Sequence, residues 1–286
     1  MSEMEENAAT SQWAMTSGDV WAQRWRDTDR GLSGLAPQLL SSIVACAPSR
    51  PFRAFDVGSG PGSTAIAMTE ACPEAEITAC DISPALVELA RHRTAKMPQI
   101  RVVQGDAEAL APREGPFDLI FSRHGVMFFP DPVHAFRALR SAMNTGGYIV
   151  FSCFRDWVLN PWASELASVV AGKVVPAPGR EPSGFAFADP DYVREILGAA
   201  GWMEIEPTAV DFSYVAADGG DAIGRTLSFF AEIGPASRIL QSLPEEDRSS
   251  AIERMRGVIE RHFDGTAVTF PAAAWIWRAK PSAATG

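Results

Sequence analysis

The 286-residue sequence lacks the features that identify several classes of protein. Its four cysteines form no C-x-x-C pair and its four histidines lie far apart, so we expect neither a disulfide framework nor a zinc site, and no metal. It has no long uninterrupted apolar run, so no transmembrane helix is expected. Its arginines are scattered over a chain of formal net charge -10, which argues against nucleic acid as a partner.

The first residues, MSEMEENAATSQ, lack the basic segment and apolar core of a signal peptide, so we expect a cytoplasmic protein. Hydrophobic residues make up 47% and charged residues 21%, as in ordinary globular chains. This length allows one large domain or one domain with insertions. The expected partner is a small molecule, with no nucleic acid and no membrane, and nothing in the sequence sets the oligomeric state.

Short apolar runs alternate with helix-like stretches between residues 52 and 154. The runs are FRAFDV, AEITAC, IRVVQ, FDLIF and GYIVFSCF, and they are almost continuously apolar. Such alternation predicts βαβ units and a doubly wound, mostly parallel sheet with helices on both faces. Residue pairs also predict helix starts at Ser83–Pro84 and Asp131–Pro132, and Asn144 with a glycine pair is expected to end a helix.

The flanking regions read as helices and two further strands. Helices are expected within residues 1–45, 160–172 and 189–201, the last capped by Asp189. Strands are expected at 203–215 and 266–281, separated by a helical block at 221–263. This block is longer than any ordinary hairpin loop, and insertions of this kind often form lids or binding surfaces.

A glycine-rich turn follows the first strand in DVGSGPGSTAIAM, where Gly58, Gly60 and Gly62 precede a helix that opens at Ser63. Glycines permit a tight turn and a close approach of a ligand to the backbone, and the helix start offers free N–H groups. The dinucleotide fingerprint requires a further glycine where this chain has Ser63. Asp81 ends the second strand, where a carboxylate can accept hydrogen bonds from ribose hydroxyls.

The segments DVGSGPGS, ACDIS, QGDAEAL and FDLIFSRHGVMFFPDP, in this order, resemble the class I S-adenosylmethionine-dependent methyltransferases, and GGYIVFSCF matches their fifth strand. The resemblance covers residues 54–154 and extends to NPW and FAFADPDYVREIL, which are similar to a bacterial small-molecule subgroup. It implies a single domain over 1–286 with a Rossmann-like, seven-stranded sheet whose last strand is antiparallel. Residues 1–45 would supply cap helices, 46–154 the cofactor-binding core, and 155–188 and 218–265 insertions that form a substrate lid.

The resemblance also implies which residues bind S-adenosylmethionine. Asp56 and the turn residues would hold the methionine moiety, together with the carbonyl of Ser122; the turn residues are Gly58, Ser59, Gly60 and Gly62. Asp81 would bind the ribose. Against these roles, Asp56 or Asp81 could cap the segment that follows it.

The adenine moiety would meet residues after the second and third strands, and an N-terminal helix would cover the cofactor. Ile82 would pack against the ring, Asp106 would bind its amino group, and Ala107 would offer a backbone N–H. Trp21, in WAQRW, would belong to the cap. The alternatives are a turn role for Asp106 and plain core packing for Trp21.

Candidate groups for the chemistry are few. His124 follows the fourth strand and could act as a base or orient the substrate, although similar sequences often carry an apolar aromatic residue there; its alternative is a pocket wall. Arg123 could anchor a substrate carboxylate or form an ion pair with a nearby acid such as Asp131. Arg155 and Asn160 could supply polar contacts to the substrate.

The expected pocket wall is largely aromatic, which suits a flat, apolar substrate, and each member has core packing as its alternative. The wall candidates are Met127, Phe128, Phe154, Trp157, Trp162, Phe185, Phe187, Phe229 and Phe230. We therefore expect methyl transfer to a small, largely apolar metabolite, on a hydroxyl or carboxylate oxygen, with N- or C-methylation open. Two other readings are a nicotinamide-dependent oxidoreductase, disfavoured by Ser63 and by the lack of a Tyr-x-x-x-Lys pair, and a non-enzymatic cofactor-binding module.

Overall fold

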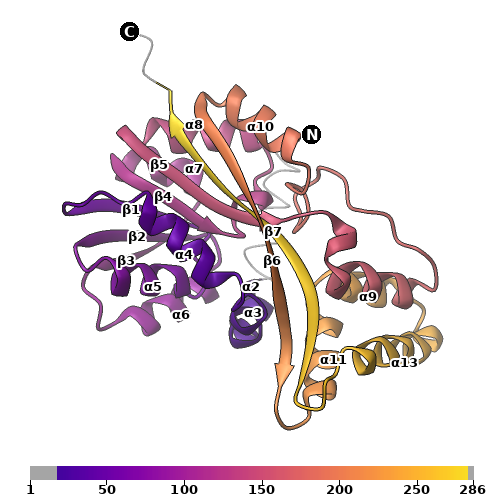
Figure 1. The fold of residues 1–286 in the computed structure, drawn as a ribbon. Helices are drawn as coiled ribbons and strands as arrows, with labels where there is room; N and C mark the ends of the chain where they lie inside the picture. Colours follow the sequence, from indigo (N-terminus) through magenta and orange to yellow (C-terminus); the bar gives the residue numbers. More distant parts are fainter. Residues whose placement is uncertain (1–17, 283–286) are drawn as a thin grey trace.

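A single seven-stranded sheet runs through the computed structural model, which describes residues 18–282 (Figure 1). The strand order is β3-β2-β1-β4-β5-β7-β6, and β7 is antiparallel to both of its neighbours. The strands are β1 (Phe52–Val57), β2 (Ala75–Asp81), β3 (Ile100–Gln104), β4 (Phe117–Arg123), β5 (Met143–Phe154), β6 (Trp202–Asp218) and β7 (Ala267–Pro281). The expected Rossmann-like α/β architecture is thereby confirmed.

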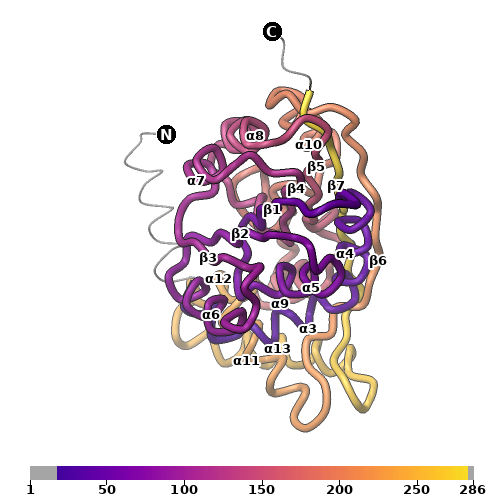
Figure 2. The backbone as a smooth tube through the Cα atoms, turned by 90° about the vertical axis from the view of Figure 1, so that its left-hand side faces the viewer, coloured from indigo at the N-terminus to yellow at the C-terminus, as the bar shows by residue number. Residues whose placement is uncertain are grey.

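Helices cover both faces of the sheet (Figures 1 and 2). One face carries α4 (Ala36–Ala45), α5 (Ser63–Ala71) and α6 (Pro84–Thr94); the other carries α7 (Ala107–Glu114), α8 (Pro132–Ser141) and α10 (Pro190–Ala199). The central strands are apolar on both sides because neither side meets water: β4 is buried from Phe117 to Ser122. Residues 36–45, expected in the cap, belong to this layer, since Leu39 and Ile43 of α4 lie in the core.

Side-chain caps start the helices where the sequence predicts them. The Ser83 hydroxyl accepts from the Leu86 N–H at the start of α6, and Asp131 and Asp189 cap α8 and α10. The helix end predicted at Asn144 is wrong. Helix α8 ends at Ser141 because the chain at Met143 already pairs with Phe117 as the start of β5.

The outer halves of β6 and β7 extend beyond the rest of the sheet as a two-stranded arm (Figure 1). Four helices pack beside this arm and form the helical lobe: α9 (Pro161–Ala171), α11 (Ala222–Glu232), α12 (Pro235–Ser242) and α13 (Glu245–Arg261). Helix α9 contacts α12 and α13, so the segments 155–188 and 218–265 meet in space although residues 189–217 separate them in the chain.

Two short helices, α2 (Gly18–Gln23) and α3 (Trp25–Gly31), link the sheet core to the lobe. Helix α2 packs on α6, and α3 packs on β6. A Cβ on Gly31 would lie 2.7 Å from the Tyr214 hydroxyl of β6, so the Tyr214 ring packs directly against the backbone of α3. Arg24 donates to Ser228 of α11 (2.6 Å) and forms an ion pair with Glu232.

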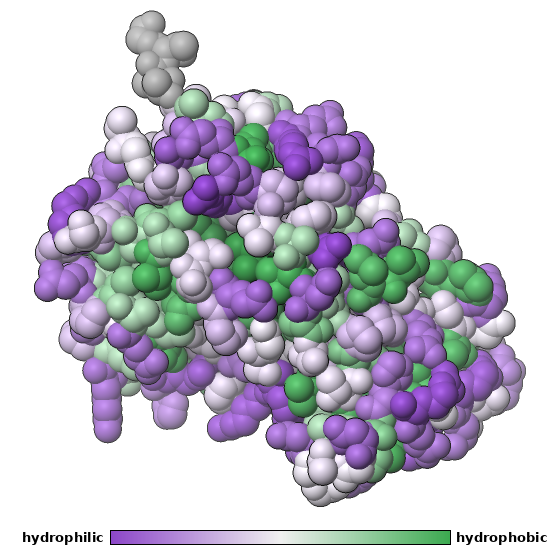
Figure 3. Space-filling model, in the orientation of Figure 1, coloured by the Kyte–Doolittle hydropathy of each residue, from purple (hydrophilic) through white to green (hydrophobic). Residues whose placement is uncertain are grey.

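The surface mixes hydrophilic and apolar side chains on the face drawn in Figure 3. Val158, Leu159 and Val174, next to the ends of α9, are exposed apolar residues. Between residues 18 and 282, none of the helices combines the length and the hydropathy that crossing a membrane would require.

Candidate functional site

The glycine turn lies at the carboxyl end of β1 and adopts a backbone that only glycine takes readily. Gly58, Gly60 and Gly62 have φ values of 62°, 54° and 80°, and Gly62 precedes the first residue of α5. A Cβ on Gly58 would lie 3.1 Å from the Cα of Gly125, which follows β4. The turn thus brings the start of α5 and the end of β4 to the same edge of the sheet, where α/β folds bind ligands.

Asp81 ends β2 beside this turn and is 7% exposed. Its carboxylate accepts the N–H of Gly60 (2.8 Å) and the N–H of Ser83 (2.9 Å). Burial raises the pKa of the Asp81 carboxyl, while the amides of Ser83, Gly60 and Ile82 oppose the rise. A carboxylate has about four acceptor positions, so this one keeps capacity for further donors such as hydroxyls. Ser83, and not Asp81, caps the following helix.

Four buried polar atoms on the ends of β1 and β4 and in the turn have no hydrogen-bond partner within residues 18–282. They are both carboxylate oxygens of Asp56, the hydroxyl of Ser59 and Nε2 of His124. Asp56 is 1% exposed, and burial raises the pKa of its carboxyl to about 8, against the attraction of Arg123. Unsatisfied buried polar groups are uncommon in folded proteins, so a cluster of them indicates a place for a polar ligand.

Ser122 and Gly125 join the ends of β4 and β1. The Ser122 hydroxyl donates to the Val57 carbonyl (2.7 Å) and accepts from the Gly125 N–H (3.2 Å). A Cβ on Gly125 would lie 2.7 Å from the same carbonyl. Gly125 was not predicted from the sequence, although its position just past a strand that ends in polar residues is a signal that could have found it.

Asp29 of α3 is a second residue at this site that was not predicted from the sequence. Its carboxylate accepts from Arg123 of β4 (2.5 Å) and from the Ser63 hydroxyl at the start of α5 (2.5 Å), and Arg93 of α6 lies 3.9 Å away. The expected ion pair of Arg123 with a nearby acid is therefore present, but its partner is Asp29 and not Asp131, because Asp131 caps α8. These contacts hold helix α3 beside the glycine turn, between the end of β4 and the start of α5.

His124 has a left-handed backbone conformation, with φ 57°, which is rare for a residue with a side chain. Its backbone N–H donates to the Ser152 carbonyl of β5 (3.2 Å), and its Nδ1 lies 2.8 Å from the Ser152 hydroxyl. Its ring packs edge-on against Phe154, with 4.2 Å between the ring centres. Burial, with Arg123 nearby, lowers the pKa of His124 to about 3, so the imidazole is neutral at pH 7.

The residues assigned to the adenine moiety and to the cap lie around this edge. Ile82 directly follows Asp81 and is half-buried. Asp106 caps α7 by accepting the Glu108 N–H (2.9 Å), which supports its structural alternative, and Ala107 is buried. Trp21 lies on α2, which packs on α6, and it is half-buried. Their contacts to a cofactor stay predictions.

Most of the expected wall residues form one aromatic cluster where the sheet meets the helical lobe. Phe154 lies 4.9 Å from Trp162 and 5.4 Å from Phe185 between ring centres, and Trp162 stacks on Tyr214 at 5.0 Å. The cluster continues through Trp157, Phe230 and Phe229. Through Phe154 it reaches His124, so an apolar region borders the cluster of unpartnered polar atoms.

Met127 and Phe128 lie in the short helix η2 (Val126–Phe128) that follows His124 and Gly125, where Met127 is buried and Phe128 half-buried. Met127 and Phe128 therefore follow His124 closely in the chain. Phe187 lies apart, packed against Phe136 and Phe151 in the core. For Phe187 the structure favours the core alternative.

Arg155 and Asn160 are held by other parts of the protein. Arg155 donates to Asp211 of β6 (2.7 Å) and lies over the Trp275 ring. Asn160 is fully buried, and its amide binds the backbone of Ala273 in both directions as well as Trp162 Nε1. These bonds occupy the polar atoms of Asn160 and favour a structural role over the predicted substrate contact.

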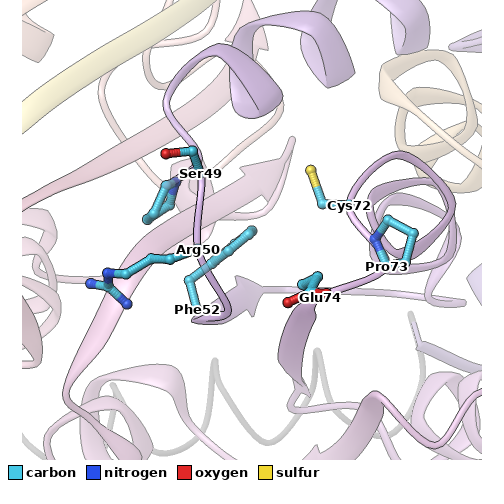
Figure 4. A pocket seen from close by; sticks show the side chains of 7 residues that line it. Ser49, Arg50, Phe52, Cys72, Pro73 and Glu74 are labelled. Atoms are coloured by element: carbon cyan, nitrogen blue, oxygen red, sulfur yellow. The ribbon is translucent and has the colours of Figure 1, made fainter.

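Two surface pockets lie at the opposite edge of the sheet. The pocket in Figure 4, about 180 Å³, is lined by Arg50 and Phe52 at the start of β1 and by Cys72 and Glu74 after α5. A second, of about 340 Å³, is lined by residues near Asp118 and Tyr148. Neither lies at the carboxyl edge. Within residues 18–282 no group of three or more His, Cys, Asp and Glu side chains is arranged to hold a metal ion.

Known proteins resemble this chain in sequence and in fold. Residues 55–151 match a family model described as "Methyltransferase domain". The malonyl-[acyl-carrier protein] O-methyltransferase of Geobacter sulfurreducens is 29% identical over 58% of this chain and 61% of its own length. The trans-aconitate 2-methyltransferase of Escherichia coli is 30% identical over 49% of this chain and 54% of its own length. The matches thus span less than two thirds of either relative.

Solved structures share the fold at low sequence identity. The YcgJ protein of Bacillus subtilis covers 86% of this chain and 99% of its own, with a TM-score of 0.56 and 18% identity. A phosphoethanolamine N-methyltransferase 2 of Haemonchus contortus, in complex with S-adenosyl-L-methionine, covers 96% of this chain and 60% of its own, with a TM-score of 0.56 and 16% identity. These neighbours establish a common architecture.

Proposed function

Because this chain carries a class I S-adenosylmethionine-dependent methyltransferase domain, we propose that it transfers a methyl group from S-adenosylmethionine to an oxygen of a small, largely apolar metabolite. The names of the two relatives support the reaction, since one is a malonyl-[acyl-carrier protein] O-methyltransferase and the other is a trans-aconitate 2-methyltransferase. A fold neighbour that is in complex with S-adenosyl-L-methionine supports the cofactor.

The observation that carries the proposal is the set of unpartnered buried atoms beside the glycine turn. Neither Asp56 oxygen has a donor in hydrogen-bond geometry within the described part of the chain, and a cationic ammonium such as that of the methionine moiety would supply charge and N–H groups together. Asp81 has acceptor capacity for ribose hydroxyls, and the start of α5 offers backbone N–H groups to a carboxylate. The residues therefore fit this cofactor, which would supply an electrophilic methyl group when bound.

In this proposal the protein's own residues position the reactants and exclude water. Helix α3 closes over the turn through Asp29, and the helical lobe supplies the apolar cluster around Trp162 as the lid side of the acceptor site. Phe154 and Met127 would line the boundary between the two reactants. Since the matched relatives are covered only in part, the acceptor is defined here by chemistry, as an apolar molecule with a reactive oxygen.

Calorimetric titration with S-adenosylmethionine and with NADH tests the cofactor. Binding of S-adenosylmethionine alone is expected, and binding of NADH alone would establish the oxidoreductase alternative. Transfer of labelled methyl to a panel of small acids, alcohols, phenols and amines then tests the reaction. Tight cofactor binding with no transfer to any of them would favour the non-enzymatic module.

A further inference from the structure

The hydrogen bond between His124 and Ser152 decides which nitrogen of the imidazole carries the proton. The Ser152 side chain is fully buried in β5, and its hydroxyl lies 2.8 Å from His124 Nδ1. Within residues 18–282, the histidine nitrogen is the one hydrogen-bond partner that this hydroxyl has. A buried hydroxyl proton without an acceptor costs free energy, so the hydroxyl donates and Nδ1 accepts.

The proton of the neutral ring is then on Nε2, since a neutral imidazole has one donor and one acceptor nitrogen. Nε2 is buried and has no partner within the described part of the chain, so its N–H is a donor that can bind a ligand oxygen. The strained backbone of His124, its N–H bond to Ser152 and the edge-on contact with Phe154 fix the direction of the ring. A nitrogen that already carries a proton cannot take one from a substrate hydroxyl.

We propose that His124 is an Nε2–H donor, locked by Ser152, that orients the acceptor oxygen without removing a proton from it, and that the acceptor is therefore a carboxylate. This inference rests on the proposed function. A carboxylate is ionised at neutral pH, whereas alcohols and phenols are not and usually benefit from a base. A carboxylate can also accept a hydrogen bond from Nε2–H while another lone pair attacks, which an amine with its single lone pair cannot do.

The reaction balances without a proton acceptor. A carboxylate oxygen of the acceptor forms the new bond to the methyl carbon, and the bond from that carbon to sulfur breaks with its electron pair left on sulfur. The products are a methyl ester and S-adenosylhomocysteine, and no proton is released. Asp56 would not compete as a base, because in the proposed function it binds the cofactor's ammonium.

The tautomer can be measured without any reaction. Long-range proton–nitrogen correlation spectra of protein with isotope-labelled histidine should show His124 with an unprotonated Nδ1 and a protonated Nε2. The His124→Gln variant assigns the signal. His262 is a reference signal with an acceptor at each nitrogen, because its Nδ1 lies 3.3 Å from the Thr269 carbonyl and its Nε2 lies 3.3 Å from the Glu165 carboxylate. Ser152→Ala should mix the tautomers of His124 and leave His262 unchanged. A protonated Nδ1 on His124 overturns the proposal.

The acceptor class is tested with labelled S-adenosylmethionine and matched pairs, each an apolar carboxylic acid and the alcohol of the same carbon skeleton. We expect transfer to acids, with a product that alkali hydrolyses to labelled methanol. His124→Gln, which keeps an N–H donor, should stay within about tenfold of the wild type, whereas His124→Ala should raise KM about tenfold to a hundredfold. Transfer to the alcohols with an inactive His124→Gln overturns the proposal and leaves the proposed function standing. Cofactor binding without transfer to any acceptor overturns the proposed function. The tautomer spectra do not depend on transfer, so they still test whether His124 Nε2 carries the proton.

Discussion

Replacing Asp56 by Asn should stabilise the cofactor-free protein, although it removes a residue that we assign to cofactor binding. Asp56 is buried with no donor in hydrogen-bond geometry within residues 18–282, and burial raises the pKa of its carboxyl from 3.8 to about 8. Between these two pH values the folded protein holds a proton that the unfolded chain releases, so stability falls as pH rises through this window. Each pH unit costs about 1.4 kcal/mol, which gives about 4 kcal/mol at pH 7 as an upper value. Asn is neutral at every pH and does not carry this cost.

Urea denaturation of cofactor-free protein, followed by circular dichroism at pH 5, 6, 7 and 8, measures the effect. The variant should gain up to about 4 kcal/mol at pH 7 and progressively less toward pH 5. Asp118→Asn is the matched control. Asp118 is a buried carboxylate with three donors, from Arg50, Arg53 and Asn144, and these donors hold its pKa low. This variant should lose stability over the same range. An Asp56→Asn variant with no gain at pH 7, or a gain that does not shrink with falling pH, would refute the reasoning.

Four further outcomes are expected. Binding of S-adenosylmethionine at pH 7 should release nearly one proton, because Asp56 ionises when it meets the ammonium. The calorimetric heat should then depend on the ionisation enthalpy of the buffer, and equal heats in all buffers would contradict this prediction. Asp81→Asn should weaken cofactor binding roughly 10- to 100-fold in the same calorimeter, because an amide cannot accept at both positions. Gly125→Ala should lower the free energy of unfolding by about 1–3 kcal/mol, whereas Gly179→Ala, with open space around its Cβ, should be neutral in the same urea titration. Asn160→Ala should lower stability by about 1–3 kcal/mol with little change in acceptor KM if its role is structural, and a raised KM at unchanged stability would restore the predicted substrate contact.

The fold was predictable from the sequence because its signals are local. Continuous apolar runs such as FDLIF mark strands buried on both faces, and Ser83 and Asp131 cap helices through bonds to residues three positions on. The prediction at Asn144 failed because strand pairing overrode a turn signal: Met143 is already paired with Phe117. The second insertion was visible in the sequence as a long helical block, but its meeting with the first in one lobe depends on contacts between α9 and α13.

The sequence by itself determined the sheet, the glycine turn and the carboxylates at the strand ends, because parallel strands bring their carboxyl ends to one edge whatever else the chain does. Tertiary structure alone decided the partners of those groups. Asp29 reaches Arg123 across 94 residues, and Asn160 reaches Ala273 across 113. The role of His124 was likewise open in the sequence, since base and donor are the same residue type. The buried hydroxyl of Ser152, placed on the neighbouring strand, selects between them.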